Sequence, residues 1–159
     1  MAHIIQNPRS SCALGGAVST VSSIYRAVSI YHAGPGCVIQ SNAGVGKTIN
    51  ANYLFGNIPN SNMYEREIIF GGIDRLKETI DGALEVMDGD EYFVLTGCSP
   101  DIIGDDAAGL VEEYRSKGIP IVHIETSGFK GDTMKGYESV LNIFPDKLAG
   151  ERTRTKSTQ

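Results

Sequence analysis

The sequence predicts an α/β fold in which a parallel sheet carries helices on both faces. The uninterrupted apolar run at 92–96 is typical of a strand buried on both faces of such a sheet, and residues 119–124 predict a further buried strand. Helical patterns alternate with the predicted strands through short connections, as right-handed crossovers require. With 159 residues, of which 41% are hydrophobic and 21% charged, the chain has the size and balance of one ordinary domain.

The first half of the chain predicts two strands and one clear helix. Small apolar residues at helical spacing predict a close-packed helix over 14–25, followed by a short strand over 27–32. Gly-Pro-Gly at 34–36 predicts a turn. Residues 41–62 are rich in Asn, Gly and Ser and predict a loop around a short helix, and the apolar run at 67–70 predicts a strand that stops at a glycine pair.

The second half carries the strongest helical pattern. Over 73–87 the apolar residues are spaced so that they would lie on one face of a helix, with charged residues on the other face. This segment therefore predicts an amphipathic helix. Strands are predicted at 92–96 and 119–124, and helices at 105–117 and 132–143. The expected architecture is a Rossmann-like parallel sheet flanked by helices.

Charge and hydropathy exclude several classes of partner. The net charge is -5, and without the basic segment 147–159 the body stands at -8, which offers no clustered basic face to nucleic acid. No apolar run reaches the length of a membrane span, and residues 1–10 lack the pattern of a signal peptide, so we expect a cytoplasmic protein. We expect one domain over 1–146 and a polar tail or linker over 147–159.

Three cysteines, Cys12, Cys37 and Cys98, are the first candidates for chemistry. An odd number of thiols in a reducing compartment is more typical of packed, catalytic or metal-binding residues than of disulfides. Each has small neighbours, which would let backbone amides approach an iron–sulfur cluster, and Cys37 and Cys98 follow predicted strands, where ligands collect in α/β sheets. Because such a cluster normally takes four protein ligands, the others would come from a second chain. Spacing alone leaves buried packing of the thiols as the alternative.

Two other ligand sites compete with the cluster. The three cysteines with His32 or His123 have the ligand count of a structural zinc site, although they contain no short ligand pair. Residues 41–48 resemble a phosphate loop ending in Lys47 and Thr48, but serine stands where the pattern needs its first glycine. A Gly-rich surface loop is the simpler interpretation of that segment.

The acidic pair Asp105–Asp106 precedes a predicted helix. Carboxylates at that position accept hydrogen bonds from the free amides of the first turn and complement the helix dipole. We therefore expect a helix cap here rather than a metal or acid–base site.

Four ordered motifs and a fifth short one combine into a family resemblance. They are Ser-Cys-Ala-Leu-Gly-Gly-Ala at 11–17, Tyr-His-Ala-Gly-Pro-Gly-Cys at 31–37, Ile-Phe-Gly-Gly at 69–72, Gly-Cys-Ser-Pro-Asp-Ile-Ile-Gly-Asp-Asp at 97–106 and Ser-Gly-Phe-Lys-Gly at 127–131. In order and approximate spacing they resemble the amino-terminal domain of nitrogenase component 1 subunits, a superfamily that includes nitrogenase-like reductases. The resemblance covers about residues 7–144.

The resemblance implies that Cys12, Cys37 and Cys98 ligate an iron–sulfur cluster shared with a homologous component 1 subunit. The cluster would be an eight-iron P-cluster or a four-iron 4Fe-4S cluster. Electrons would come from an ATP-hydrolysing iron protein and pass through the cluster to a substrate-reducing site. A scaffold subunit for iron–sulfur cofactor assembly is the alternative from this resemblance, and a P-loop nucleotide-binding domain is the alternative from another class.

The resemblance also bears on length. Family subunits are several hundred residues long and have three such domains, and their active-site cofactor ligands lie beyond the stretch that this chain covers. The chain is therefore expected to correspond to the first third of a subunit and to catalyse no substrate reduction alone.

Overall fold

The computed structural model describes residues 11–45 and 58–143. Its centre is a sheet of three parallel strands in the order β1-β2-β3, formed by Ala27–His32, Glu91–Thr96 and Ile121–Glu125. Ile30 pairs with Val94, and Val94 pairs with His123, so the strands end together at one edge. The predicted α/β class is confirmed.

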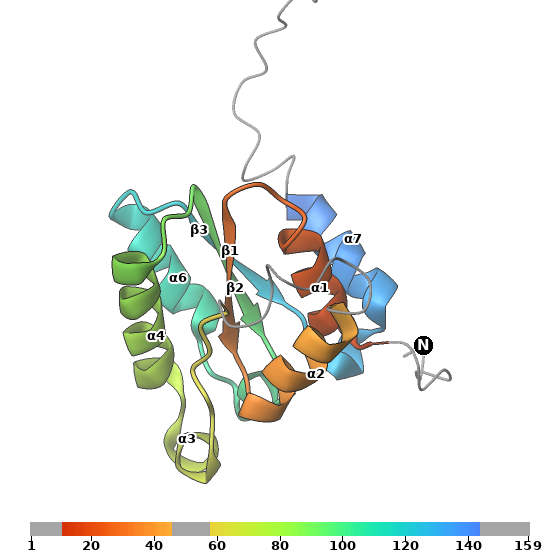
Figure 1. The fold of residues 1–159 in the computed structure, drawn as a ribbon. Helices are drawn as coiled ribbons and strands as arrows, with labels where there is room; N and C mark the ends of the chain where they lie inside the picture. Colours follow the sequence, from red (N-terminus) through yellow and green to blue (C-terminus); the bar gives the residue numbers. More distant parts are fainter. Residues whose placement is uncertain (1–10, 46–57, 144–159) are drawn as a thin grey trace, which may run out of the picture.

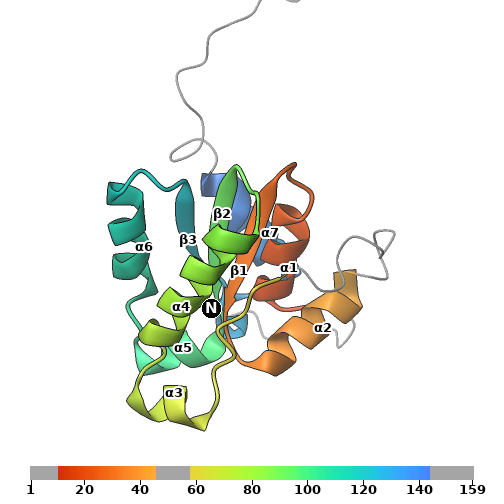
Figure 2. The same ribbon diagram turned by 60° about the vertical axis from the view of Figure 1, so that its left-hand side comes forward.

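Helices cover both faces of the sheet, as Figures 1 and 2 show. On one face lie α4 (Ile73–Val86) and α6 (Ala107–Ser116), which connect successive strands. Because the strand order advances in one direction, crossovers of the same hand place both helices on the same side. On the other face α1 (Ala13–Val21) packs against α7 (Thr133–Ile143).

Each face of the sheet has its own hydrophobic core. Alternate strand residues point to opposite faces, so Phe93 and Leu95 pack with α1 and α7, whereas Tyr92 and Val94 pack with α4 and α6. Burial on both faces explains the uninterrupted apolar run at 92–96.

The α1–α7 crossing is unusually close, since a glycine from each helix lies in it. A Cβ on Gly16 would fall on the carbonyl oxygen of Thr133 and 2.7 Å from its carbonyl carbon. A Cβ on Gly136 would meet the carbonyl oxygen of Ala13 and lie 2.7 Å from the nitrogen of Ala17. The two backbones therefore touch directly, as expected for a helix of small residues.

The clearest error in the predicted elements concerns residues 67–70, which are helical. They form the end of α3 (Glu65–Phe70), whose first turn is closed by a hydrogen bond from the Tyr64 N–H to the Glu67 carboxylate at 3.0 Å. No residue of α3 is buried, and Phe70 is 82% exposed. A short apolar run does not by itself distinguish a strand from a helix.

Residues 35–36 of the predicted turn and residues 41–45 of the predicted loop are also helical. Pro35 begins α2 (Pro35–Val45), where its missing N–H costs nothing and its fixed φ suits the first helical position. Residues 46–57 lie outside the described part of the chain. Beyond them, residues 58–61 run beside β1, and the Tyr31 N–H donates to the Pro59 carbonyl at 2.8 Å.

The remaining predicted elements differ from the observed ones mainly at their ends. The helix expected over 14–25 ends at Val21, and a short helix that was not predicted, α5 (Cys98–Ile103), follows β2. A single 3-10 turn, η2 (Gly128–Lys130), follows β3. None of the helices within 11–45 and 58–143 is long and apolar enough to cross a membrane. The predicted tail over 147–159 lies outside the described residues.

Candidate functional site

The three cysteines lie at the starts of three helices at the carboxyl edge of the sheet. Cys12 is the N-cap of α1, Cys37 is in the first turn of α2, and Cys98 is the first residue of α5. Helix starts present free amide groups and a positive dipole end, and both favour anionic sulfur. The placement of Cys37 and Cys98 after strands agrees with the sequence.

Cys12 is held by contacts with the start of α7. It forms an isolated antiparallel bridge with Asp132, and the N–H of Ala13 donates to the carbonyl of Gly131 at 3.1 Å. The Thr133 hydroxyl donates to the carbonyl of Ser11 at 2.7 Å. The α1–α7 crossing thus fixes the backbone of this thiol.

Cys37 is half-buried and packs against the hydrophobic core shared by α1 and α7. Burial raises the pKa of its thiol, and the neighbouring thiols of Cys12 and Cys98 raise it further. The three sulfurs are therefore within electrostatic reach of one another. Because like charges repel, negative charge on the neighbouring sulfurs disfavours the thiolate form of Cys37.

Gly128 lies between the other two cysteines. A Cβ built on it would be 3.2 Å from Cys12 Cβ, 3.4 Å from Cys98 Sγ and 3.9 Å from Cys12 Sγ. The N–H of Gly128 donates a hydrogen bond to Cys98 Sγ at 3.2 Å. A side chain at this position would project between the two thiols, so glycine keeps the space open and lets a backbone amide reach sulfur.

The cysteines do not form a compact site for one ion. Within residues 11–45 and 58–143, no three His, Cys, Asp or Glu side chains converge closely enough to hold a single metal ion. A multi-iron cluster makes a different demand, since each thiolate binds a separate iron atom and the sulfurs stand around the cluster. The set of three thiol donors, and the backbone amide that Gly128 presents to Cys98 Sγ, fit such a group.

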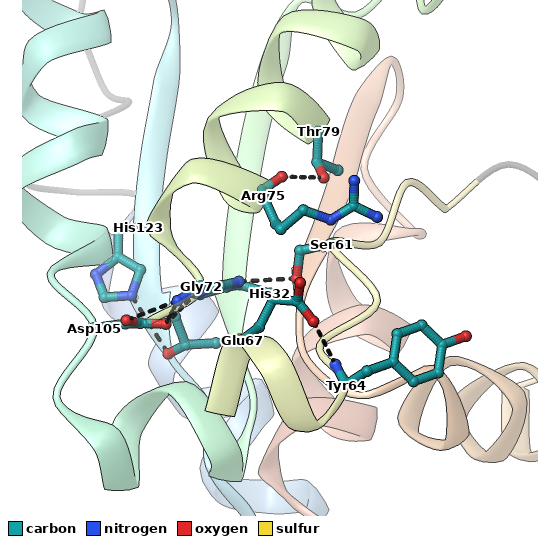
Figure 3. A network of polar contacts seen from close by, with 10 residues as sticks. His32, Ser61, Tyr64, Glu67, Gly72, Arg75, Thr79, Asp105 and His123 are labelled. Atoms are coloured by element: carbon teal, nitrogen blue, oxygen red, sulfur yellow. Dashed lines mark hydrogen bonds and ion pairs between the residues drawn. The ribbon is translucent and has the colours of Figure 1, made fainter. Parts of the chain in front are cut away.

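His32 is engaged in a buried network, drawn in Figure 3, which leaves it unsuited to a zinc site. Its Nδ1 lies 2.9 Å from the Ser61 hydroxyl and its Nε2 lies 3.1 Å from an Asp105 carboxylate oxygen. His123 Nε2 lies 3.4 Å from the Thr96 hydroxyl. Burial lowers the pKa of both histidines, and Asp105 opposes this for His32. The zinc interpretation does not fit this geometry.

The acidic pair has two separate roles. Asp106 is the N-cap of α6, and its carboxylate accepts the N–H of Gly109 at 2.8 Å, which confirms the predicted cap. Asp105 instead accepts the N–H of Gly72 at 2.9 Å as well as facing His32. It therefore joins the start of α4 to the end of β1, a long-range role that no local sequence pattern indicates.

The phosphate-loop candidate is only partly within the described residues. Residues 41–45 form the last turns of α2, whereas a phosphate loop is a non-helical turn between a strand and a helix. Lys47 and Thr48 lie outside the described part of the chain.

A group of polar residues beside Cys98 was not anticipated from the sequence. Asp101 accepts hydrogen bonds from the hydroxyls of Ser127 and Thr96, and its carboxylate lies 3.2 Å from Lys130 Nζ, which also pairs with Glu125. Burial would raise the pKa of Asp101, but these donors outweigh it and lower the pKa. The motifs at 97–106 and 127–131 contain Asp101, Ser127 and Lys130, but nothing in their sequence indicates these contacts.

Comparison with known proteins identifies strong similarity to one family. The family model described as nitrogenase component 1 type oxidoreductase matches residues 12–159. The nitrogenase molybdenum-iron protein beta chain of Sinorhizobium fredii is 26% identical over 161 residues, covering 97% of this chain and 30% of the relative. The nitrogenase iron-iron protein beta chain of Rhodobacter capsulatus is 28% identical over 153 residues, covering 90% of this chain and 33% of the relative.

A biosynthetic protein and a solved structure are also similar. The nitrogenase iron-molybdenum cofactor biosynthesis protein NifE of Clostridium pasteurianum is 26% identical over 144 residues, covering 90% of this chain and 31% of the relative. The structure titled nitrogenase Cp1 at pH 6.5 superposes with a TM-score of 0.80 at 24% identity, over 99% of this chain and 33% of that one, which shows the same fold. The chain spans about a third of the length of these relatives.

Proposed function

Because the chain belongs to the nitrogenase component 1 type oxidoreductase family, we propose that it forms the cluster-binding domain of a nitrogenase-like subunit. In this proposal residues 1–146 form the domain, and Cys12, Cys37 and Cys98 bind an iron–sulfur cluster of the eight-iron or four-iron type. The protein works in the cytoplasm, where thiols stay reduced.

One observation carries the proposal: three thiols lie at the starts of three separate helices at the carboxyl edge of the sheet, and two of them lie on either side of Gly128. Cys12 and Cys98 flank the glycine, and Cys37 is within electrostatic reach of both. Each thiol is the side chain of a residue at a helix start, where negative charge is stabilised. Packing alone does not explain Cys98, which is exposed.

Proton release accompanies ligation at this site. The raised pKa of Cys37 means that its thiol is protonated at neutral pH in the metal-free chain. Binding of iron replaces the thiol protons and offsets the repulsion among the sulfurs, so loading becomes more favourable as pH rises. When bound, the cluster supplies one-electron transfer.

A second subunit completes the site in this proposal. Exposed apolar side chains come from the elements around the cysteines, and a homologous component 1 subunit would cover part of this surface. They are Ile39 in α2, Ile69 and Phe70 in α3, Ile102 in α5 and Phe129 in η2. All three thiols lie at the carboxyl edge of the sheet, so the shared cluster and the interface coincide.

Electron supply and substrate reduction involve other parts of the complex. An ATP-hydrolysing iron protein would deliver electrons at the cysteine edge, and they would pass on to a substrate-reducing site in the remaining two thirds of a family-length subunit. The role of this domain is to hold the relay cluster in a fixed position between the two.

The experiment that tests this proposal is anaerobic purification of the chain co-expressed with its partner subunit. We expect a brown complex whose iron and visible absorption are lost in Cys12→Ala, Cys37→Ala and Cys98→Ala. Ser99→Ala, which alters a neighbour of Cys98 without removing a thiol, is the matched control and keeps its iron. Electron paramagnetic resonance of the reduced complex distinguishes four-iron from eight-iron clusters.

Two results would refute the proposal. One is a colourless wild-type complex after anaerobic preparation, and the other is full retention of iron in all three cysteine variants.

A further inference from the structure

Asp101 lies on the same short helix as Cys98, one turn further along. Residues three apart on a helix are neighbours on one face, so the carboxylate and the sulfur both face the segment that follows β3. That segment contains Ser127, Gly128 and Lys130, and each of these residues has a polar contact with the Asp101 or the Cys98 side chain.

The contacts form a clamp, which we define as Asp101, Ser127 and Lys130. The Ser127 hydroxyl donates to the Asp101 carboxylate, and Lys130 Nζ lies 3.2 Å from the same group. Ser127 is fully buried and the Asp101 side chain is only 11% exposed, so water competes poorly for these bonds. Gly128, between the two clamp residues of the segment, is thereby held against α5.

We propose that this clamp positions the Gly128 N–H on Cys98 Sγ and thereby raises the reduction potential of the cluster bound there. The effect on the reduction potential rests on the proposed function, because it requires a bound cluster. The positioning of the Gly128 amide by the clamp does not depend on a cluster. Hydrogen bonds to ligand sulfurs stabilise the reduced state, which carries more negative charge, and so raise the potential. Asp101, Ser127 and Lys130 are positioning residues, because they act through the backbone of Gly128.

The direction in which Asp101→Ala changes the reduction potential distinguishes two explanations. One is positioning of the Gly128 amide, and the other is the direct effect of the Asp101 charge on the cluster. Removing the negative charge of Asp101 near a cluster would by itself raise the potential. If the clamp positions the amide, Asp101→Ala releases Gly128 and lowers the potential instead. Ser127→Ala removes one contact of the clamp without changing any charge, and it is expected to lower the potential in the same direction.

Glu125→Gln is the matched control. Glu125 pairs with Lys130, and its side chain is 61% exposed. The buried hydrogen bond of the clamp instead joins Ser127 to Asp101. Glu125→Gln therefore removes a negative charge and leaves the Ser127–Asp101 hydrogen bond in place. The potential of this variant is expected to stay equal to or above that of the wild type.

The reduction potential of the cluster is measured by a redox titration of the co-expressed complex. Electron paramagnetic resonance monitors the titration. A potential in Ser127→Ala and Asp101→Ala that is more negative than in the wild type supports the proposal. A potential unchanged or raised in both variants overturns it.

Hydrogen exchange of the Gly128 amide in the iron-free chain tests the clamp without a cluster. We expect exchange to be about three- to tenfold faster in Ser127→Ala than in the wild type, and unchanged in Glu125→Gln. Equal exchange in Ser127→Ala and wild type would overturn the clamp. A wild-type complex without iron would instead refute the cluster proposal and the tuning role, while the exchange result would still decide whether the clamp holds Gly128.

Discussion

Replacing Gly16 by alanine would insert a methyl group into the crossing of α1 and α7. The new carbon would fall on the backbone of Thr133, 2.7 Å from its carbonyl carbon. Backbone atoms have no rotamer to change, so the helices must separate by roughly 1 Å to restore ordinary carbon–carbon contact near 3.5 Å. Overpacking of this kind costs about 3 kcal/mol at the upper end, and the better helix propensity of alanine returns about 1 kcal/mol.

The net expectation for Gly16→Ala is a loss of about 2 kcal/mol in the free energy of unfolding. In urea unfolding followed by circular dichroism, this loss lowers the midpoint by about 1 M, with an unchanged slope of about 2 kcal/mol/M. Gly136→Ala opens the same crossing from the other helix. The double variant should therefore cost less than the sum of the two single variants.

Gly82 provides the matched control for this substitution. It lies within α4 on the exposed side, and a Cβ there meets no atom within 4 Å. Gly82→Ala should therefore raise the unfolding free energy by about 0.5–1 kcal/mol. A Gly16→Ala variant as stable as the wild type, or stabilised like Gly82→Ala, would refute the close crossing.

Three further predictions concern pH and hydrogen bonds. Because burial lowers the pKa of His32 and His123 in the folded chain, the unfolded chain binds more protons below about pH 6.5, so stability falls as pH drops from 7 to 5. His123→Gln should flatten this fall, and a pH dependence identical to wild type would contradict it. Asp106→Ala removes the α6 cap and should cost about 1 kcal/mol in urea unfolding. Tyr114→Phe removes the hydroxyl that donates to Asp81 at 2.5 Å, and should cost about 1 kcal/mol in thermal or urea unfolding; equal midpoints would argue against that bond.

The parts of the fold that local pattern controls were predictable. The helix over 73–87 and the strand over 92–96 have strong periodicity or continuous apolar character, and both are present almost to their predicted ends. The strand prediction for residues 67–70 was wrong because their apolar side chains face away from the core. Burial is a tertiary property that four residues do not encode.

The candidate site also has parts that were predictable from local sequence and parts that were not. The position of Cys37 and Cys98 followed from their place after strands, because parallel strands end together at one edge. The approach of Cys12 to Gly128 depends on how α1 crosses α7, and the bonds of Asp101 and Asp105 join segments distant in sequence. Contacts of this kind arise only when the sheet is assembled, so no local pattern reveals them.

The attachment of the thiols to separate helices has a consequence for the order of biogenesis. Cys12 and Cys98 are separated by more than half of the chain, and Gly128, which lies between them, belongs to the segment after β3. A nascent or unfolded chain therefore has no local thiol pair with which to capture iron. If the proposed cluster binds here, its loading would follow folding, and the bound cluster would hold three helices together against chain entropy.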